Sequence, residues 1–189
     1  MKKTATGFLL IILAACGQRE AATTTGTAAQ PPNAATTTGE AEATEIAQVG
    51  KPMPAFTAQM LDGSTFDLAK ERGNVVLLNL WATWCGPCRY EIPELEKLHK
   101  QHAAQRFKVV GVSVDEGGDQ VVRDFVEEQK VSYPIALDPQ SRLSMILETV
   151  ILPTSVIVDR KGTVVWKKLG VVTTDDEEMI RALDAAFRS

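Results

Sequence analysis

The chain has 189 residues, of which 44% are apolar and 23% are charged, and its 20 basic and 24 acidic side chains give a net charge of −4. These proportions are ordinary for a globular protein and argue against a collagen, a fully disordered chain or a multi-span membrane protein. The negative net charge argues against a nucleic-acid binder that relies on bulk positive potential. Three cysteines are too few for a disulfide scaffold, and one is left over if two of them pair.

Residues 1–15 have the pattern of a secretory signal. Lys2 and Lys3 form a positive start, and residues 7–15 are apolar and uncharged. This run is about half the ~20 residues that a helix needs to cross a bilayer, so it indicates a cleaved signal peptide. The run ends in Leu-Ala-Ala-Cys, which resembles the lipobox of bacterial lipoproteins. The resemblance implies cleavage before Cys16 and lipid attachment to it. The alternative is an ordinary secretory signal followed by a chance cysteine.

Residues 16–45 are expected to contain the lipid-attachment site and a disordered tether. The segment after Cys16 is rich in Ala and Thr and contains no Val, Ile, Leu, Met or aromatic side chain. Such a segment cannot bury enough apolar surface to offset its ordering entropy. Random-coil scaling gives it a root-mean-square reach of about 30 Å, which would let an attached domain search the space near a membrane. A spacer of no defined length is the alternative.

Residues 46–189 are expected to form one α/β domain. The Asp62-Gly63 pair predicts a hairpin turn between strands at 56–60 and 64–67. The nearly continuous apolar run at 75–81 is typical of a strand that is covered on both faces.

The rest of the domain alternates between helical and strand patterns, which indicates a mixed sheet. The further helices are expected at 88–105, 119–129, 140–148 and 175–187, and the further strands at 107–114, 133–137, 154–158 and 163–169. Thr174 and Glu177 have the spacing of a capping box at the start of the last helix.

The motif Trp84-Cys85-Gly86-Pro87-Cys88 follows the buried strand and opens a helix. Two residues between the cysteines, on the first helical turn, let the sulfurs approach to bonding distance. The partial positive charge and free N–H groups of the helix N-terminus favour a thiolate. Cys85 is therefore predicted to have a lowered pKa and to be the nucleophile, and Cys88 to resolve the mixed disulfide.

The cysteine pair has three other interpretations. A structural disulfide across so short a loop would restrict the unfolded chain little. Half of a zinc site would need further ligands, but His99 lies about 16 Å beyond Cys88 along the same helix and His102 lies farther still. Two unrelated core cysteines are the third alternative.

The chain resembles the thioredoxin superfamily, and within it the membrane-tethered TlpA/ResA-like thiol–disulfide oxidoreductases, over roughly residues 49–189. The resemblance rests on the sequences at 79–93, 152–154 and 159–162. It implies a thioredoxin fold with an N-terminal β-hairpin and a central strand–helix insertion at 119–148.

The resemblance also implies roles for residues around the cysteines. Pro153 matches the family's cis-proline, which faces the cysteine pair. It would keep a backbone amide away from the sulfurs, and the adjacent Leu152 backbone would pair with an extended substrate. Trp84, Gly86 and Pro87 are expected to contact the substrate as well. A loop proline before a strand is the alternative for Pro153.

Two positions near the cysteines differ from ordinary thioredoxins. Asn79 stands where those proteins bury an acid, and it cannot exchange a proton. Glu91 follows Cys88 by three residues and matches a glutamate of the TlpA/ResA-like branch. We expect Glu91 to have a raised pKa and to carry the Cys88 proton. An exposed helix glutamate is the alternative.

The neighbouring charged residues Arg89, Glu94 and Lys97 are expected to lie on a solvated helix face. Pro93 matches the proline that kinks the family's active-site helix, and a simple helix irregularity is its alternative.

The predicted function is a lipid-anchored, extracytoplasmic thiol–disulfide oxidoreductase that works as a reductase without a cofactor or metal. The resemblance implies protein thiol or disulfide substrates, in cytochrome c maturation or envelope thiol balance, and a membrane electron donor of the CcdA/DsbD type. One alternative is a peroxiredoxin-like thiol peroxidase, although Ala82 stands where its threonine is usual and Thr83 is out of register. The other is a metal carrier, for which no histidine is placed near the cysteines.

Overall fold

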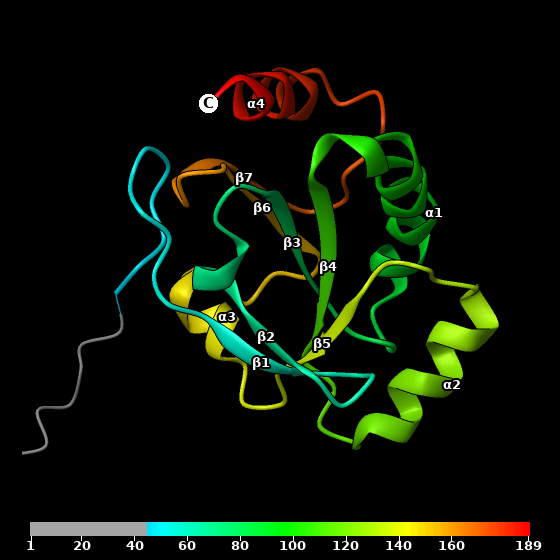
Figure 1. The fold of residues 1–189 in the computed structure, drawn as a ribbon. Coiled ribbons are helices and arrows are strands. Elements are labelled where there is room, and N and C mark those ends of the chain that lie inside the picture. The colour runs from blue at the N-terminus through cyan, green and yellow to red at the C-terminus, as the bar shows by residue number, and fades with distance from the viewer. Residues whose placement is uncertain (1–44) are drawn as a thin grey trace, which may run out of the picture. The chain divides into compact units, whose positions relative to one another are not determined.

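A seven-stranded mixed sheet lies at the centre of the computed structural model, which describes residues 45–189 (Figure 1). The predicted signal peptide, Cys16 and all of the predicted tether except Glu45 lie outside the described residues. No helix within residues 45–189 has both the length and the hydropathy that a membrane span requires.

The strands are arranged in the spatial order β2-β1-β5-β4-β3-β6-β7. Their bounds are β1 Thr57–Met60, β2 Thr65–Asp67, β3 Val75–Trp81, β4 Phe107–Ser113, β5 Ile135–Leu137, β6 Thr154–Val158 and β7 Val164–Leu169. Strand β3 pairs in parallel with β4 and antiparallel with β6, and β4 pairs in parallel with β5. Every side chain of β3 is buried, as its apolar run predicts.

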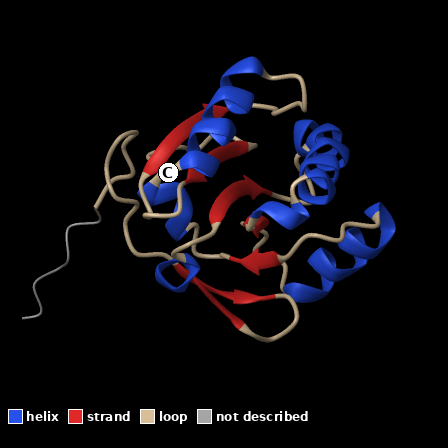
Figure 2. Ribbon diagram, turned by 45° about the horizontal axis from the view of Figure 1, so that its top comes forward, coloured by secondary structure: helices blue, strands red, loops and turns tan. Residues whose placement is uncertain are grey.

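Helices cover both faces of this sheet, with the strands as the middle layer (Figure 2). The helices are α1 Gly86–Gln101, α2 Asp119–Gln129, α3 Arg142–Ile146 and α4 Glu177–Arg188. Helices α1, α2 and α4 pack against one face, and α3 packs against the other together with the segment that precedes β1. The two layers of apolar side chains bury β3 from both sides.

The expected thioredoxin-like architecture is confirmed, including the hairpin and the insertion. Strands β1 and β2 pair antiparallel around the Asp62-Gly63 turn, where Gly63 has a φ of 88°. A positive φ of this size favours glycine, which has no Cβ. The 119–148 segment forms α2, β5 and α3, and β5 is inserted between β4 and β1.

Helix boundaries differ from expectation in α1, α3 and α4, and α3 is shorter at both ends than the expected 140–148. Helix α1 begins at Gly86 and ends at Gln101, and a short 3-10 turn follows at Ala103–Gln105. The predicted capping box of the last helix is wrong, because the N-cap of α4 is Asp176. Its carboxylate accepts hydrogen bonds from the N–H groups of Glu178 and Met179. The hydroxyl of Thr174 donates to Glu94 instead.

Gly111 lies inside β4, where three large side chains approach its Cα. A Cβ at this position would lie 2.8 Å from Ile135 Cδ1, 3.0 Å from Trp81 Nε1 and 3.1 Å from Tyr133 Cε2. The aromatic side chains sit between the sheet and α1, so this close approach determines how the layer beneath α1 packs. Only a residue without a Cβ fits here without displacing its neighbours.

We therefore expect Gly111→Ala to lower the free energy of unfolding by about 1–3 kcal/mol, the usual cost of overpacking a core. Urea denaturation followed by tryptophan fluorescence measures this change. Gly117→Ala is the matched control, because a Cβ there would lie 3.6 Å from Val121 Cγ1, at ordinary contact distance. Equal stability of the two variants would contradict the packing argument.

Candidate active site

Cys85 and Cys88 are joined by a disulfide at the N-terminus of α1, with their Cα atoms 5.3 Å apart. Cys85 is the N-cap of the helix, and its Sγ accepts a hydrogen bond from the Cys88 N–H at 3.2 Å. Pro87 lies in the first turn, where a missing N–H costs no hydrogen bond. The N-terminus of α1 can therefore stabilise negative charge on Cys85 once the disulfide is reduced.

The Leu152-Pro153 motif lies at the same end of the central strands as the cysteine pair. Strand β3 ends here and continues into the cysteine motif. Strand β6 runs antiparallel to β3 and begins here, with Thr154 paired to Leu80. Leu152 and Pro153 directly precede β6 and are joined by a cis peptide bond. Leu152 is half-buried against the apolar cluster that contains both cysteines.

Exposed apolar side chains flank both motifs. Trp84, immediately before Cys85, is 70% exposed, and Gly86 and Pro87 are exposed as well. Val150 and Ile151 lie just before Leu152, and Val150 is 98% exposed. The cysteines themselves are buried, at 4% and 1% exposure. A partner that reaches the disulfide therefore meets a rim of apolar side chains. The sequence predicted contacts at Trp84 and Pro87 but not at Val150 or Ile151.

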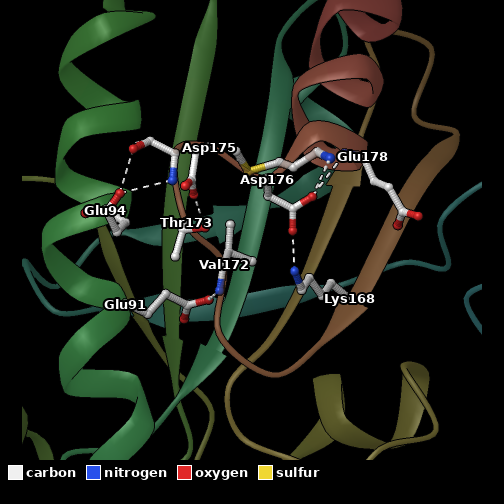
Figure 3. A network of polar contacts seen from close by, with 10 residues as sticks. Glu91, Glu94, Lys168, Val172, Thr173, Asp175, Asp176 and Glu178 are labelled. Atoms are coloured by element: carbon white, nitrogen blue, oxygen red, sulfur yellow. Dashed lines mark hydrogen bonds and ion pairs between the residues drawn. The ribbon is translucent and has the colours of Figure 1, made fainter.

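Glu91 is fully buried one helical turn beyond Cys88. Its carboxylate accepts a hydrogen bond from the Val172 N–H at 2.8 Å (Figure 3). It also accepts one from Asn79 Nδ2 at 2.6 Å. Burial raises the pKa of Glu91 to about 7, while the hydrogen bonds from Val172 and Asn79 oppose that rise. The exposed-glutamate alternative is therefore wrong. Asn79 also donates to Ser155 Oγ at 2.9 Å, which connects Glu91 to β6.

Glu94, the next acid on α1, binds the same segment of the chain. Its carboxylate accepts hydrogen bonds from the Thr174 N–H at 3.0 Å and from the Thr174 hydroxyl at 2.6 Å (Figure 3). The hydrogen bonds from Lys97 and Thr174 lower the pKa of Glu94 to about 2. Farther along, Lys168 pairs with Asp176, the cap of α4. The stretch between β7 and α4 is thus fastened to the active-site helix.

The expected solvated face of α1 is only partly correct. Arg89 and Lys97 are exposed, but the Glu94 carboxylate is partly buried and accepts hydrogen bonds from Thr174 in the chain before α4. The Arg89 guanidinium lies 5.0 Å from the Phe125 ring centre and donates to the Thr83 carbonyl. Sequence reasoning missed these contacts because their partners are distant in sequence.

The histidines are not near the cysteine pair in any metal-binding arrangement. His102 packs against the rings of Phe107 and Phe187, and His99 lies edge-on to Tyr133. Within residues 45–189, no group of three or more His, Cys, Asp or Glu side chains is placed to hold a metal ion.

Comparisons with known proteins agree with this geometry. The redoxin family profile matches residues 48–183. The thiol-disulfide oxidoreductase ResA of Bacillus cereus is 31% identical over 134 residues, which cover 71% of this chain and 77% of the relative. The thioredoxin-like protein YneN of Bacillus subtilis is 34% identical over 139 residues, which cover 72% of this chain and 81% of the relative.

Solved structures show the same fold. A putative thiol:disulfide interchange protein DsbE from Chlorobium tepidum superposes with a TM-score of 0.69 at 28% identity, covering 75% of this chain and 99% of that one. The structure of StoA from Bacillus subtilis gives a TM-score of 0.58 at 26% identity over 67% of this chain and 96% of that one. With its cysteine pair at the start of α1, this chain belongs to the redoxin family and is a thiol–disulfide oxidoreductase of the thioredoxin fold.

Proposed function

We propose that this chain is a lipid-anchored, extracytoplasmic disulfide reductase in which Cys85 attacks and Cys88 resolves. The observation that carries the proposal is the Cys85–Cys88 pair at the N-terminus of α1, one turn before the buried Glu91. The Cys85–Cys88 disulfide is the oxidised form of the enzyme, which the reaction produces. The working form is the dithiol.

In the first step the Cys85 thiolate attacks one sulfur of a substrate disulfide. The substrate S–S bond breaks, a Cys85–substrate disulfide forms, and the other substrate sulfur leaves as a thiolate that takes a proton from water. Cys85 is the better nucleophile of the pair because it caps the helix, where the Cys88 N–H already donates to its sulfur.

In the second step Cys88 attacks Cys85 Sγ. The Cys88 thiol must lose its proton, and at 1% exposure it has little access to water. Glu91 is the proposed acceptor, because a carboxylate with a pKa of about 7 is partly ionised near neutral pH. The Cys85–Cys88 disulfide forms, and the second substrate sulfur leaves and is protonated. Two electrons and two protons have then passed to the substrate.

The Asn79 side chain can hydrogen-bond to Glu91 in both its ionised and its protonated form. Its amide group donates to ionised Glu91 through Nδ2. After rotation by half a turn its oxygen can instead accept a hydrogen bond from protonated Glu91, since an amide presents a donor on one side and an acceptor on the other. An aspartate at this position would add a second buried charge beside Glu91. Asn79 thus leaves Glu91 as the single proton carrier in our proposal.

Leu152 is the proposed main-chain contact for the substrate. Within residues 45–189, its N–H and C=O groups make no hydrogen bond, so they are free to pair with an extended peptide. Pro153 has no N–H to compete for the sulfurs. Trp84, Gly86 and Pro87 would form the other side of the contact, because all three are exposed beside Cys85.

The cellular setting is proposed from the sequence. Lipid on Cys16 would hold the domain at a membrane, facing the extracytoplasmic or periplasmic space, and a membrane thiol donor of the CcdA/DsbD type would reduce the disulfide again. Apocytochrome c or other envelope proteins would be the substrates. One relative from Bacillus subtilis, 29% identical to this chain, is named a sporulation thiol-disulfide oxidoreductase.

We expect Cys88→Ser to accumulate mixed disulfides with substrate proteins in cells, because the first step proceeds and the second cannot. Non-reducing electrophoresis and mass spectrometry of the purified adducts measure this. Cys85→Ser is the matched control and should trap far less. Peroxide consumption by the wild-type chain, without trapped substrates in Cys88→Ser, would instead support the thiol peroxidase alternative.

We expect Glu91→Gln to slow the second step about tenfold or more at neutral pH, because the buried Cys88 loses its proton acceptor. Stopped-flow measurement of mixed-disulfide resolution against pH tests this. Glu94→Gln is the matched control, because Glu94 also binds the chain before α4 but lies a further turn from Cys88. Equal rates and pH profiles for both variants would contradict the proton-acceptor role.

Glu91 should also make stability depend on pH. Folding raises its pKa from 4.5 to about 7, so the folded state keeps a proton that the unfolded state loses as the pH rises. The free energy of unfolding should therefore fall between about pH 4.5 and pH 7, by roughly 3 kcal/mol from this group. Urea denaturation of the oxidised chain at pH 5 and pH 8 measures it. In Glu91→Gln this part of the fall should vanish, and an unchanged difference would be incompatible with a buried, titrating Glu91.

A further inference from the structure

Asp115 is a buried acid at the end of β4 that the proposed chemistry does not use. It is 7% exposed, and its carboxylate accepts hydrogen bonds from the Thr83 hydroxyl at 2.6 Å and from the Ser113 hydroxyl at 2.7 Å. The Thr83 N–H donates to the same carboxylate at 3.0 Å. Of the ion pairs within residues 45–189, none includes Asp115. Its charge is balanced by hydrogen bonds alone, most of them from one residue of the active-site loop.

Thr83 lies in the short loop that joins β3 to α1. Trp81 ends the strand, Cys85 caps the helix, and Thr83 is halfway between them. On its other side, the Thr83 carbonyl accepts hydrogen bonds from Arg89 Nε and Nη2, both at 3.4 Å. Thr83 is therefore held through its N–H, its hydroxyl and its C=O, and the acidic partner lies on a different strand.

The loop position determines where Cys85 Sγ lies. The Cys85 N–H donates to the Ala82 carbonyl at 3.1 Å, and the Cys88 N–H donates to Cys85 Sγ at 3.2 Å. A carboxylate that fixes Thr83 fixes this turn, and with it the alignment of the sulfur with the helix N-terminus. That alignment is what lowers the pKa of a helix-capping thiol.

We infer that Asp115 is a positioning residue for the attacking thiol, which it acts on through Thr83. Its carboxylate anchors the loop to the end of β4, so that Cys85 Sγ stays over the N–H groups of α1 after the disulfide is reduced. The inference rests on Cys85 as the nucleophile in the proposed function.

The test compares Asp115→Ala, Asp115→Asn and wild type as full-length, reduced proteins. The rate of Cys85 alkylation by iodoacetamide is followed from pH 5 to pH 10, with the modified peptide identified by mass spectrometry. Asp115→Ala should shift the midpoint of the profile upward by about one pH unit, which lowers the rate at any pH well below the wild-type midpoint by about tenfold. Asp115→Asn should restore the wild-type profile or move it lower, because its amide oxygen still accepts from Thr83 and its negative charge is gone.

Two other outcomes would overturn the inference. If Asp115 acted only through its charge, both variants would shift the profile downward, because a nearby negative charge disfavours a thiolate. If it served stability alone, both profiles would match the wild type while the melting temperature fell. Asp159→Ala is the matched control for lost stability, because Asp159 is 8% exposed and accepts two backbone N–H bonds at the far end of β6.

A second variant covers the case in which Asp115→Ala does not fold. Thr83→Val keeps the backbone bond to Asp115 and removes the hydroxyl bond, so it should shift the profile upward by a smaller amount. No shift would contradict the inference. The wild-type protein tests the proposed function separately. If Cys85 were not the nucleophile, wild-type Cys85 would react at pH 7 no faster than an ordinary thiol.

Discussion

The burial of one carboxylate organises the surroundings of the cysteine pair. Glu91 is removed from water on α1, and its hydrogen bonds come from Asn79 on β3 and from the backbone of Val172. A buried charge without such partners would cost several kcal/mol, so the helix, the central strand and the chain before α4 must keep this arrangement. The same burial gives Glu91 a pKa near neutrality, and this makes it suitable for moving a proton beside Cys88.

The sheet brings functional residues from distant parts of the chain to one end of its central strands. Strands β3 and β4 end there and β6 begins there, so the cysteine motif, Asp115 and the Leu152-Pro153 pair come together. Strand β3 is buried on both faces, so the position of its end is fixed. Short loops that follow the strand ends hold the reacting groups. The apolar rim around the sulfurs then suits partners that are themselves peptides.

The positions of active-site residues that are close in sequence could be predicted, and the contacts between residues far apart in sequence could not. The cysteine pair, Glu91 and Asn79 lie within one strand–loop–helix unit, where spacing predicts that the two cysteines meet and that Glu91 lies one turn from Cys88. The family resemblance singled out Asn79 and the role of Glu91, and the hydrogen bond between Asn79 and Glu91 was not predicted. Asp115 contacts Thr83 across 32 residues, and Glu94 contacts Thr174 across 80. Val172 acts through its backbone N–H, which carries no side-chain signal. The cap of α4 was misplaced because Thr174 and Asp176 are both good caps, and the contact with Glu94 decides between them.

The ionisation of Glu91 in the folded protein tests this account most directly. Selective ¹³C labelling of glutamate, with the Glu91 carboxyl resonance assigned through Glu91→Gln, allows its titration to be followed by NMR from pH 3 to pH 9 in the oxidised chain. The account predicts a midpoint near pH 7 for the Glu91 carboxyl. A midpoint near 4.5 would mean that the carboxylate is solvated, and would contradict both the buried network and the proton transfer that depends on it.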